Sequence, residues 1–161
     1  MLTGLAHVAV CVPDVEAAAA WYESVLGMTV LSPPYLMEGE AMTQDMGELL
    51  PGPVALKGAI VGFGRSDHVI ELVEYPNAPT EAPDGPVDLT QSGPTHLGLV
   101  CEDLDATRTA LEAEGVEFLT SGVADVANLR TTWFRDPWGV VFILMEKTTP
   151  DAPYWRQWTG P

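Results

Sequence analysis

Two histidines and two glutamates of this chain occupy matching places in two similar stretches of sequence. His7 and His96 each lie in a short apolar run with the alternation typical of a β-strand. Glu71 and Glu146 each lie inside a later apolar run, among large aliphatic residues. A carboxylate in such surroundings is expensive to bury unless a positive charge compensates it. Because a divalent metal ion is the simplest such charge, the four residues are candidate metal ligands.

Two imidazoles and two carboxylates make a mixed nitrogen and oxygen ligand set that suits Zn, Ni, Co, Mn or Fe(II). A single histidine in a strand is more often a core residue, so it is the coincidence of all four positions that indicates a metal site. If a pseudo-twofold axis relates the two stretches, equivalent residues converge on that axis and leave two or more coordination positions for water or substrate. We therefore expect one divalent ion as cofactor, and the ligand types leave its identity open.

An internal repeat relates the two stretches. The chain reads LAHVAVCVPDVEA over residues 5–17, and a similar stretch, THLGLVCEDLDA, begins at Thr95. Three pairs of identical residues, each 89 positions apart, fall in register without a gap: His7 with His96, Asp14 with Asp103, and Ala17 with Ala106. The repeat predicts two copies of one structural unit.

The hydrophobic pattern of each half predicts the order strand, helix, strand, strand, strand. The first half has expected strands at 5–12, 28–32, 54–63 and 68–75 and a helix at 15–26, which Asp14 caps and Gly27 ends. The second half has expected strands at 96–100, 116–120, 129–135 and 139–147 and a helix from Asp103 to about Glu114. Each half therefore places a histidine in its first strand and a glutamate in its last.

The remaining segments divide the chain into four parts: a first module at 1–75 with an insertion at 33–53, a linker at 76–93, a second module at 94–148 and a tail at 149–161. The insertion is rich in Pro, Gly and Met, so we expect either a mobile cover or a segment packed on a neighbouring subunit. The tail carries Trp155 and Trp158, which are costly to leave in water, so we expect it to dock on the body or on a second subunit.

Composition excludes several classes of function. Of 161 residues, 47% are apolar and only 19% are charged, as expected of a globular chain that folds alone. There are 7 Lys and Arg against 23 Asp and Glu, so a formal charge of −16 repels nucleic acid and anionic membranes. No apolar stretch is long enough to be a signal sequence or a membrane span, so we expect a cytoplasmic protein. Cys11 and Cys101 differ by one position in the repeat, which predicts buried free thiols.

The combined pattern resembles the vicinal oxygen chelate superfamily, which includes glyoxalase I, methylmalonyl-CoA epimerase, extradiol dioxygenases and bleomycin or fosfomycin resistance proteins. The motifs that carry the resemblance are the first strand around His7 with Asp14, the helix end WYESVLG at 21–27, Ile70-Glu71-Leu72, His96 with Asp103, and FRDPWG at 134–139 leading to Glu146. The resemblance implies an α+β fold of two tandem βαβββ modules, whose mixed sheets form a cup around a metal. It also implies that His7, Glu71, His96 and Glu146 are the ligands.

The four-ligand set resembles the glyoxalase I and epimerase branch, which implies a metal-dependent isomerase, epimerase or lyase. In that branch the metal holds two oxygens of a small substrate and stabilises an enediolate, while a glutamate, here Glu146 or Glu71, moves the proton. The 33–53 insertion and the scarcity of basic residues argue against glutathione and coenzyme A substrates. Candidate substrate contacts are Tyr35, Met37, Arg130 and Trp133. We expect a homodimer that binds a small-molecule substrate.

Two other functions are compatible with the pattern. In an extradiol-type dioxygenase, His7, His96 and Glu146 would form a two-histidine, one-carboxylate Fe(II) site, with Glu71 outside it. Alternation directs His68 away from Glu71, so it is poorly placed as the extra acid or base of such enzymes. A binding or resistance protein would instead hold an aromatic molecule with Tyr35, Trp133, Trp138 and the Met-rich segment.

Overall fold

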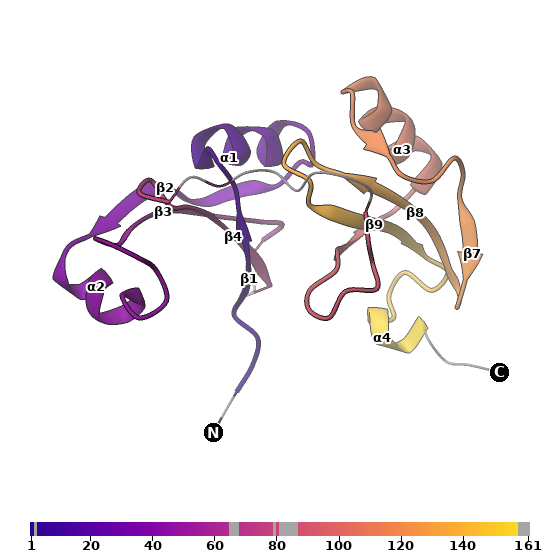
Figure 1. The fold of residues 1–161 in the computed structure, drawn as a ribbon. Helices are drawn as coiled ribbons and strands as arrows, with labels where there is room; N and C mark the ends of the chain where they lie inside the picture. Colours follow the sequence, from indigo (N-terminus) through magenta and orange to yellow (C-terminus); the bar gives the residue numbers. More distant parts are fainter. Residues whose placement is uncertain (2, 65–67, 79, 81–86, 158–161) are drawn as a thin grey trace. The chain divides into compact units, whose positions relative to one another are not determined.

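Each half of the sequence folds into its own mixed β-sheet covered by one main helix. The computed structural model describes all residues except 2, 65–67, 79, 81–86 and 158–161. The chain divides into two units, Met1–Ala82 and Pro83–Pro161, which Figure 1 colours from indigo to magenta and from magenta to yellow. The boundary falls inside the Pro-rich stretch 76–93, part of which lies outside the described residues.

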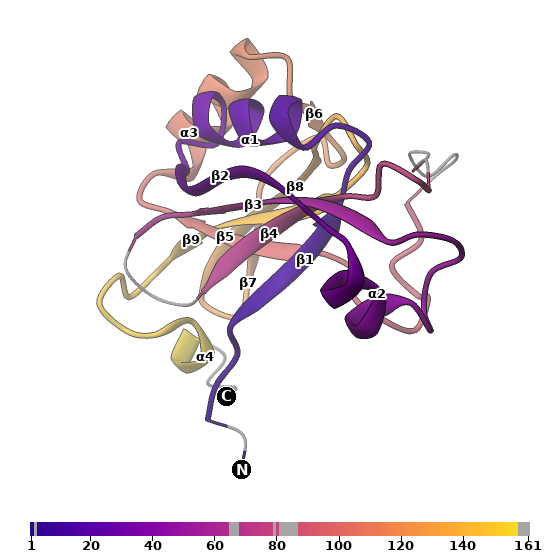
Figure 2. The same cartoon turned by 90° about the vertical axis from the view of Figure 1, so that its left-hand side faces the viewer.

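The first unit is a four-stranded sheet in the order β1-β4-β3-β2. Its strands are β1 (His7–Cys11), β2 (Thr29–Glu38), β3 (Ala55–Gly62) and β4 (Val69–Glu74). Strands β1 and β4 are parallel, and the other neighbours are antiparallel. Helix α1 (Val15–Ser24) connects β1 to β2 and lies along one face of the sheet (Figures 1 and 2). This is one βαβββ module.

Local features of the sequence explain where helix α1 begins and ends. Asp14 caps it by accepting a hydrogen bond from the Ala17 N–H at 2.9 Å. Gly27 follows it with a φ of 67°, a left-handed conformation that glycine adopts at little cost. The helix buries Ala18 and Tyr22 against one face of the sheet. Along each strand, successive side chains point alternately to this covered face and to the opposite, open face. The open face is therefore left to carry polar side chains.

The second unit repeats this plan with one interruption. Its strands are β5 (Leu97–Cys101), β6 (Glu117–Phe118), β7 (Ala124–Val126), β8 (Leu129–Arg135) and β9 (Val141–Lys147), and α3 (Leu104–Ala113) is its main helix. The sheet order is β5-β9-β8-β6, and β7 also pairs with β8. Because β6 and β7 pair with opposite ends of β8, the strand that corresponds to β2 is split in two.

The two sheets confirm the predicted α+β fold of tandem βαβββ modules. The strand expected at 28–32 is longer than predicted, and part of the 33–53 segment is regular. Its first residues lengthen β2 as far as Glu38, and α2 (Glu40–Met46) follows. The strand tolerates Pro33 and Pro34 because β2 is an edge strand, and the pairing with β3 shifts register between Ser32 and Tyr35.

The C-terminal segment is held to the second unit through Gln157 and not through Trp155, on whose burial the prediction rested. Helix α4 (Tyr154–Gln157) ends in the buried Gln157, whose side chain donates to the Thr149 carbonyl at 2.9 Å. The Asn128 side chain donates to the Gln157 carbonyl at 3.1 Å. Trp155 itself stays exposed, and Trp158 lies outside the described residues.

Two further expectations concern the thiols and the membrane. Cys11 and Cys101 are both free thiols, as predicted, but neither is buried, since Cys11 is exposed and Cys101 is half-buried. In the part of the chain that the structure describes, no helix is long and apolar enough to cross a membrane.

Candidate functional site

In the first unit the structure brings His7 and Glu71 together on the open face of the sheet. His7 lies opposite Val69, and Glu71 lies opposite Ala9, in the parallel pairing of β1 with β4. The Nε2 atom of His7 is 3.1 Å from Oε2 of Glu71. This is the distance of a hydrogen-bonded ion pair, and two donors on one ion, with bonds of about 2.1 Å, lie at a similar separation of about 3–3.5 Å. The pair thus fits two neighbouring coordination positions of a divalent metal.

Tyr75 is a further polar group near Glu71 that sequence reasoning missed. Burial raises the pKa of the Tyr75 hydroxyl, and the charges of Cys11 and Glu71 raise this pKa further. The hydroxyl therefore stays protonated at neutral pH and is a hydrogen-bond donor. The sequence does contain a signal for this residue. Tyr75 follows Glu71 by four residues, and residues an even number of positions apart point to the same side of an extended chain.

In the second unit His96 directly precedes β5 and is held by two neighbours. Its Nδ1 atom is 2.9 Å from the Thr95 Oγ1 atom. Its ring lies at 67° to the Trp133 ring, with centroids 4.8 Å apart. Among the described residues no hydrogen bond engages its Nε2 atom, so this nitrogen is the one available to a ligand.

Glu146 lies at the other end of the same pair of strands. It is opposite Cys101, five residues beyond His96, which corresponds to about 16 Å along a strand. Its Oε2 atom accepts hydrogen bonds from the Leu104 N–H at 2.9 Å and from Arg130 at 3.0 Å. The structure does not bring Glu146 to His96. These hydrogen bonds argue against the predicted role of Glu146 as a metal ligand and proton-moving group.

The internal repeat explains what Glu146 does. In the first unit Glu74 accepts a hydrogen bond from the Val15 N–H at 3.0 Å, at the start of α1. In each unit a basic side chain on the neighbouring strand forms ion pairs with two carboxylates. One belongs to the glutamate of the last strand and the other to an acidic residue of the helix. We call these sets the helix-start clamps: Glu74, Lys57 and Glu16 in the first unit, and Glu146, Arg130 and Asp105 in the second. Glu146 is thus equivalent to Glu74.

The position equivalent to Glu71 is Ile143. Ala9 and Gly98 correspond through the 89-residue repeat, and their cross-strand partners are Glu71 and Ile143 respectively. The second unit therefore has a histidine equivalent to His7 but an aliphatic residue where a second carboxylate was expected. Of the predicted ligands, this difference leaves His7 and Glu71 in the first unit and His96 in the second as candidates, each considered within its own unit.

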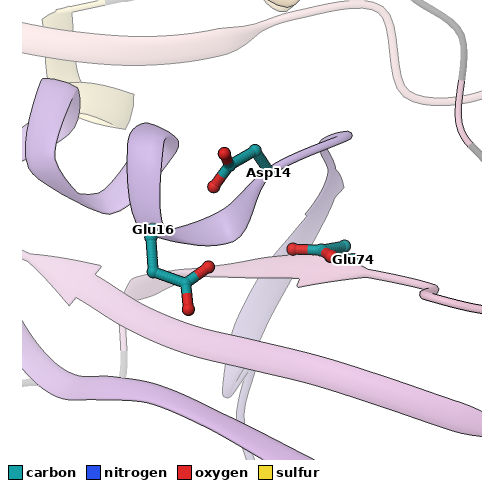
Figure 3. A group of neighbouring side chains, drawn as sticks. All are labelled: Asp14, Glu16 and Glu74. Carbon is teal, nitrogen blue, oxygen red and sulfur yellow. The ribbon is translucent and has the colours of Figure 1, made fainter.

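Three carboxylates of the first unit, Asp14, Glu16 and Glu74, offer oxygens within 4.8 Å of one another (Figure 3). That spacing alone would admit a cation. However, Asp14 caps α1, Glu74 binds the first turn of the same helix, and Lys57 pairs with Glu16. The start of α1 and the lysine side chain already compensate these negative charges. The capping role of Asp14 and the helix-start clamp therefore explain why the three carboxylates lie close together.

The structure places the four candidate substrate contacts in different surroundings. Tyr35 and Met37 lie in β2, opposite Gly58 and Leu56, and the Tyr35 side chain is exposed. Arg130 belongs to the helix-start clamp of the second unit and is engaged with two carboxylates. Trp133 lies against His96. Only Trp133 is thus placed beside a candidate ligand of its own unit.

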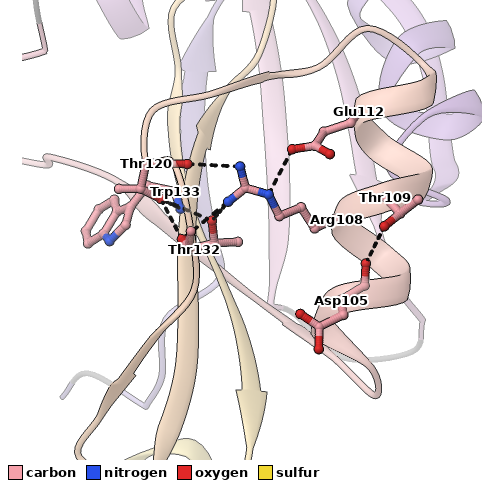
Figure 4. Close-up of polar contacts among 8 residues, drawn as sticks. Asp105, Arg108, Thr109, Glu112, Thr120, Thr132 and Trp133 are labelled. Atoms are coloured by element: carbon pink, nitrogen blue, oxygen red, sulfur yellow. Dashed lines mark hydrogen bonds and ion pairs between the residues drawn. The ribbon is translucent and has the colours of Figure 1, made fainter.

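Arg108 of α3 fixes the main chain around Trp133 (Figure 4). Its guanidinium donates to the Thr132 Oγ1 atom at 2.6 Å and to the Thr120 carbonyl at 3.0 Å. The Thr120 hydroxyl in turn accepts from the Trp133 N–H at 3.2 Å. The network bridges the interruption between β6 and β7, and it gives Trp133 a fixed place in β8.

We expect Glu146→Ala to lower the free energy of unfolding by about 1–2 kcal/mol, because it removes the acceptor of the Leu104 N–H. Glu71→Ala is the matched control. Its ion pair is with His7, whose side chain is 48% exposed, so the stability of the metal-free protein changes by less than about 1 kcal/mol. Urea unfolding of metal-free protein measures both. Equal losses at the two positions would contradict the separate roles assigned to them.

Solved structures share this fold. A glyoxalase family protein from Bacillus cereus superimposes with a TM-score of 0.78, covering 92% of this chain and 97% of that chain at 21% identity. The trypanothione-dependent glyoxalase I of Leishmania major superimposes with a TM-score of 0.62, covering 91% of this chain and 88% of that chain at 17% identity. At these identities the likeness shows the fold alone.

Sequence comparison carries the assignment further. The uncharacterized protein YaeR of Escherichia coli strain K12 is 30% identical over 141 residues, which cover 88% of this chain and 94% of YaeR. Residues 4–144 match the family described as the Glyoxalase/Bleomycin resistance protein/Dioxygenase superfamily. With most of its length matched and both modules in place, the chain belongs to this superfamily.

Proposed function

We propose that the protein is a divalent-metal-dependent enzyme in which His7 and Glu71 of the first unit are metal ligands and, on the evidence of the sequence repeat alone, His96 is a further ligand. The observation that carries the proposal is the 3.1 Å approach of His7 Nε2 to Glu71 Oε2 on the open face of the first sheet. His96 is included because it is the counterpart of His7 in the repeat and because its Nε2 atom is the available ring nitrogen. Glu146 is not included, since the second helix-start clamp engages it.

When bound, a divalent ion supplies Lewis-acid stabilisation of negative charge on neighbouring substrate oxygens. The chain supplies the proton transfer, and Glu71 is the carboxylate of the proposed set that can accept a proton from an adjacent carbon. The protonated hydroxyl of Tyr75 is a donor on the same side of the sheet. One base is enough for an isomerisation or an elimination, whereas an epimerisation by two bases needs a second group. We therefore infer an isomerase or lyase acting on a small oxygenated substrate.

An Fe(II) dioxygenase is the second candidate, and the identity of residue 143 favours it. With Ile143 in the place equivalent to Glu71, the proposed ligands are two histidines and one carboxylate. That combination is typical of non-haem Fe(II) oxygenases. The triad would consist of His7, Glu71 and His96 and would leave Glu146 outside.

Elemental analysis of protein purified without chelator tests the common part of both candidates. We expect close to one divalent ion per chain, and a folded protein that neither retains nor rebinds an ion would overturn both. Two assays then separate the reactions on metal-loaded protein. An isomerase or lyase exchanges a carbon-bound proton of α-hydroxycarbonyl compounds with deuterated solvent, whereas a dioxygenase consumes oxygen with catechols. Metal binding with neither activity would indicate a binding protein and overturn the enzymatic proposal.

A further inference from the structure

His96 is restrained from two sides by residues that sequence reasoning did not connect with it. The Thr95 hydroxyl lies 2.9 Å from the Nδ1 atom of the ring. The ring also contacts Trp133, whose main chain is fixed by the Thr120 hydroxyl at 3.2 Å (Figure 4). An exposed histidine would otherwise rotate freely about χ1 and χ2. These contacts select one orientation of the ring.

The contact at Nδ1 decides which nitrogen can bind a metal. A neutral imidazole carries one N–H, and only the other nitrogen has a lone pair for a ligand bond. If Nδ1–H donates to the Thr95 hydroxyl, Nε2 is the nitrogen with the lone pair. If the hydroxyl donates instead, Nε2 carries the hydrogen and cannot coordinate an ion. Histidines that bind metals commonly fix their tautomer through a hydrogen bond of this kind.

We propose that Thr95 is a positioning residue, which accepts the Nδ1–H of His96 and so presents Nε2 to the metal, while Trp133 holds the ring plane. The inference rests on the proposed function, because it takes His96 as a ligand. Thr95 itself touches neither ion nor substrate. It acts through the tautomer and orientation of its neighbour, and the geometry needs only the side-chain oxygen that serine would also provide.

The tautomer can be read directly in metal-free protein. At about pH 8.5, where imidazole is neutral, long-range ¹H–¹⁵N spectra distinguish a protonated nitrogen from one with a lone pair. The chain has 3 histidines, so the signals of His96 are assigned by their loss in His96→Asn. We expect hydrogen on Nδ1 in the wild type and in Thr95→Ser, and a shift toward hydrogen on Nε2 in Thr95→Val. Hydrogen on Nε2 in the wild type would overturn the role of Thr95, whether or not the protein binds metal.

Zinc titration against a chelating indicator gives the second measurement. Thr95→Val should weaken Zn²⁺ binding by about 10-fold, while Thr95→Ser stays within about twofold of the wild type. Thr109→Val is a matched control in the same unit, because its hydroxyl donates to the Asp105 carbonyl of its own helix. If Thr95→Val changes the tautomer but not the affinity, the positioning role is overturned. If the wild type shows the expected tautomer but binds no Zn²⁺, the proposed function fails instead.

Discussion

Glu71→Gln is expected to weaken the binding of a divalent ion by at least about 100-fold, more than the loss of a residue that only supports a ligand. The substitution keeps the size of the side chain but replaces a charged oxygen donor by a neutral amide. In the structure this oxygen is the one that approaches His7 Nε2. Titration of metal-free protein with Zn²⁺ or Co²⁺ measures the effect.

Glu146→Gln is the matched control for this result. Its carboxylate accepts hydrogen bonds from the Leu104 N–H and from Arg130, at the far end of the strand pair from His96. We expect an affinity within about threefold of the wild type. Loss of metal in Glu146→Gln with an unchanged Glu71→Gln would reverse the two roles and restore the first expectation from the sequence.

Arg108→Met is expected to lower the free energy of unfolding by about 3 kcal/mol, because it removes a largely buried charge that several groups depend on. The side chain is only 15% exposed, and its guanidinium lies over the Phe118 ring. Without it, the Thr120 carbonyl loses its guanidinium donor and the buried Thr132 hydroxyl keeps only its contact with the Thr120 hydroxyl among the described residues. Thermal and urea unfolding measure the loss, and a weaker contact between Trp133 and His96 should accompany it.

Arg135→Met provides the comparison for that loss. Arg135 pairs with Glu117 at 2.8 Å, but the Glu117 side chain is 60% exposed, so solvent screens the interaction. We expect a change below about 1 kcal/mol. Similar losses in both variants would show that Arg108 acts as an ordinary surface ion pair and that the interruption between β6 and β7 does not depend on it.

The sequence predicted the fold well because several separate features along the chain indicate the same fold. A gapless repeat, a capping aspartate in each half and alternating apolar runs all indicate the same βαβββ order, and each observation supports the others. The extension of β2 was missed for the opposite reason. Pro33 and Pro34 normally mark the end of a strand, and only the position of β2 at the sheet edge makes them compatible with pairing.

For the candidate site, the prediction from residue types differs from the structure in the register of one residue, Glu146. A search for residue type matches Glu146 with Glu71, because the second half has one glutamate in its last strand. Aligning residues 69–74 with 141–146 instead matches Glu146 with Glu74 and Glu71 with Ile143. The pairing of β9 with β5 decides for the second alignment. Strand residues three positions apart face opposite sides of a sheet, so the choice changes the role of the residue completely.

The two prolines of β2 also affect how the protein behaves at high concentration. The outer edge of this strand carries the exposed apolar residues Leu31, Tyr35 and Leu36. An exposed apolar edge is normally a template for the strand of another molecule and a starting point for aggregation. Neither Pro33 nor Pro34 has an N–H, and the register shift at this point breaks the regular row of donors and acceptors. The same irregularity that hid the strand in the sequence thus protects its edge from unwanted pairing.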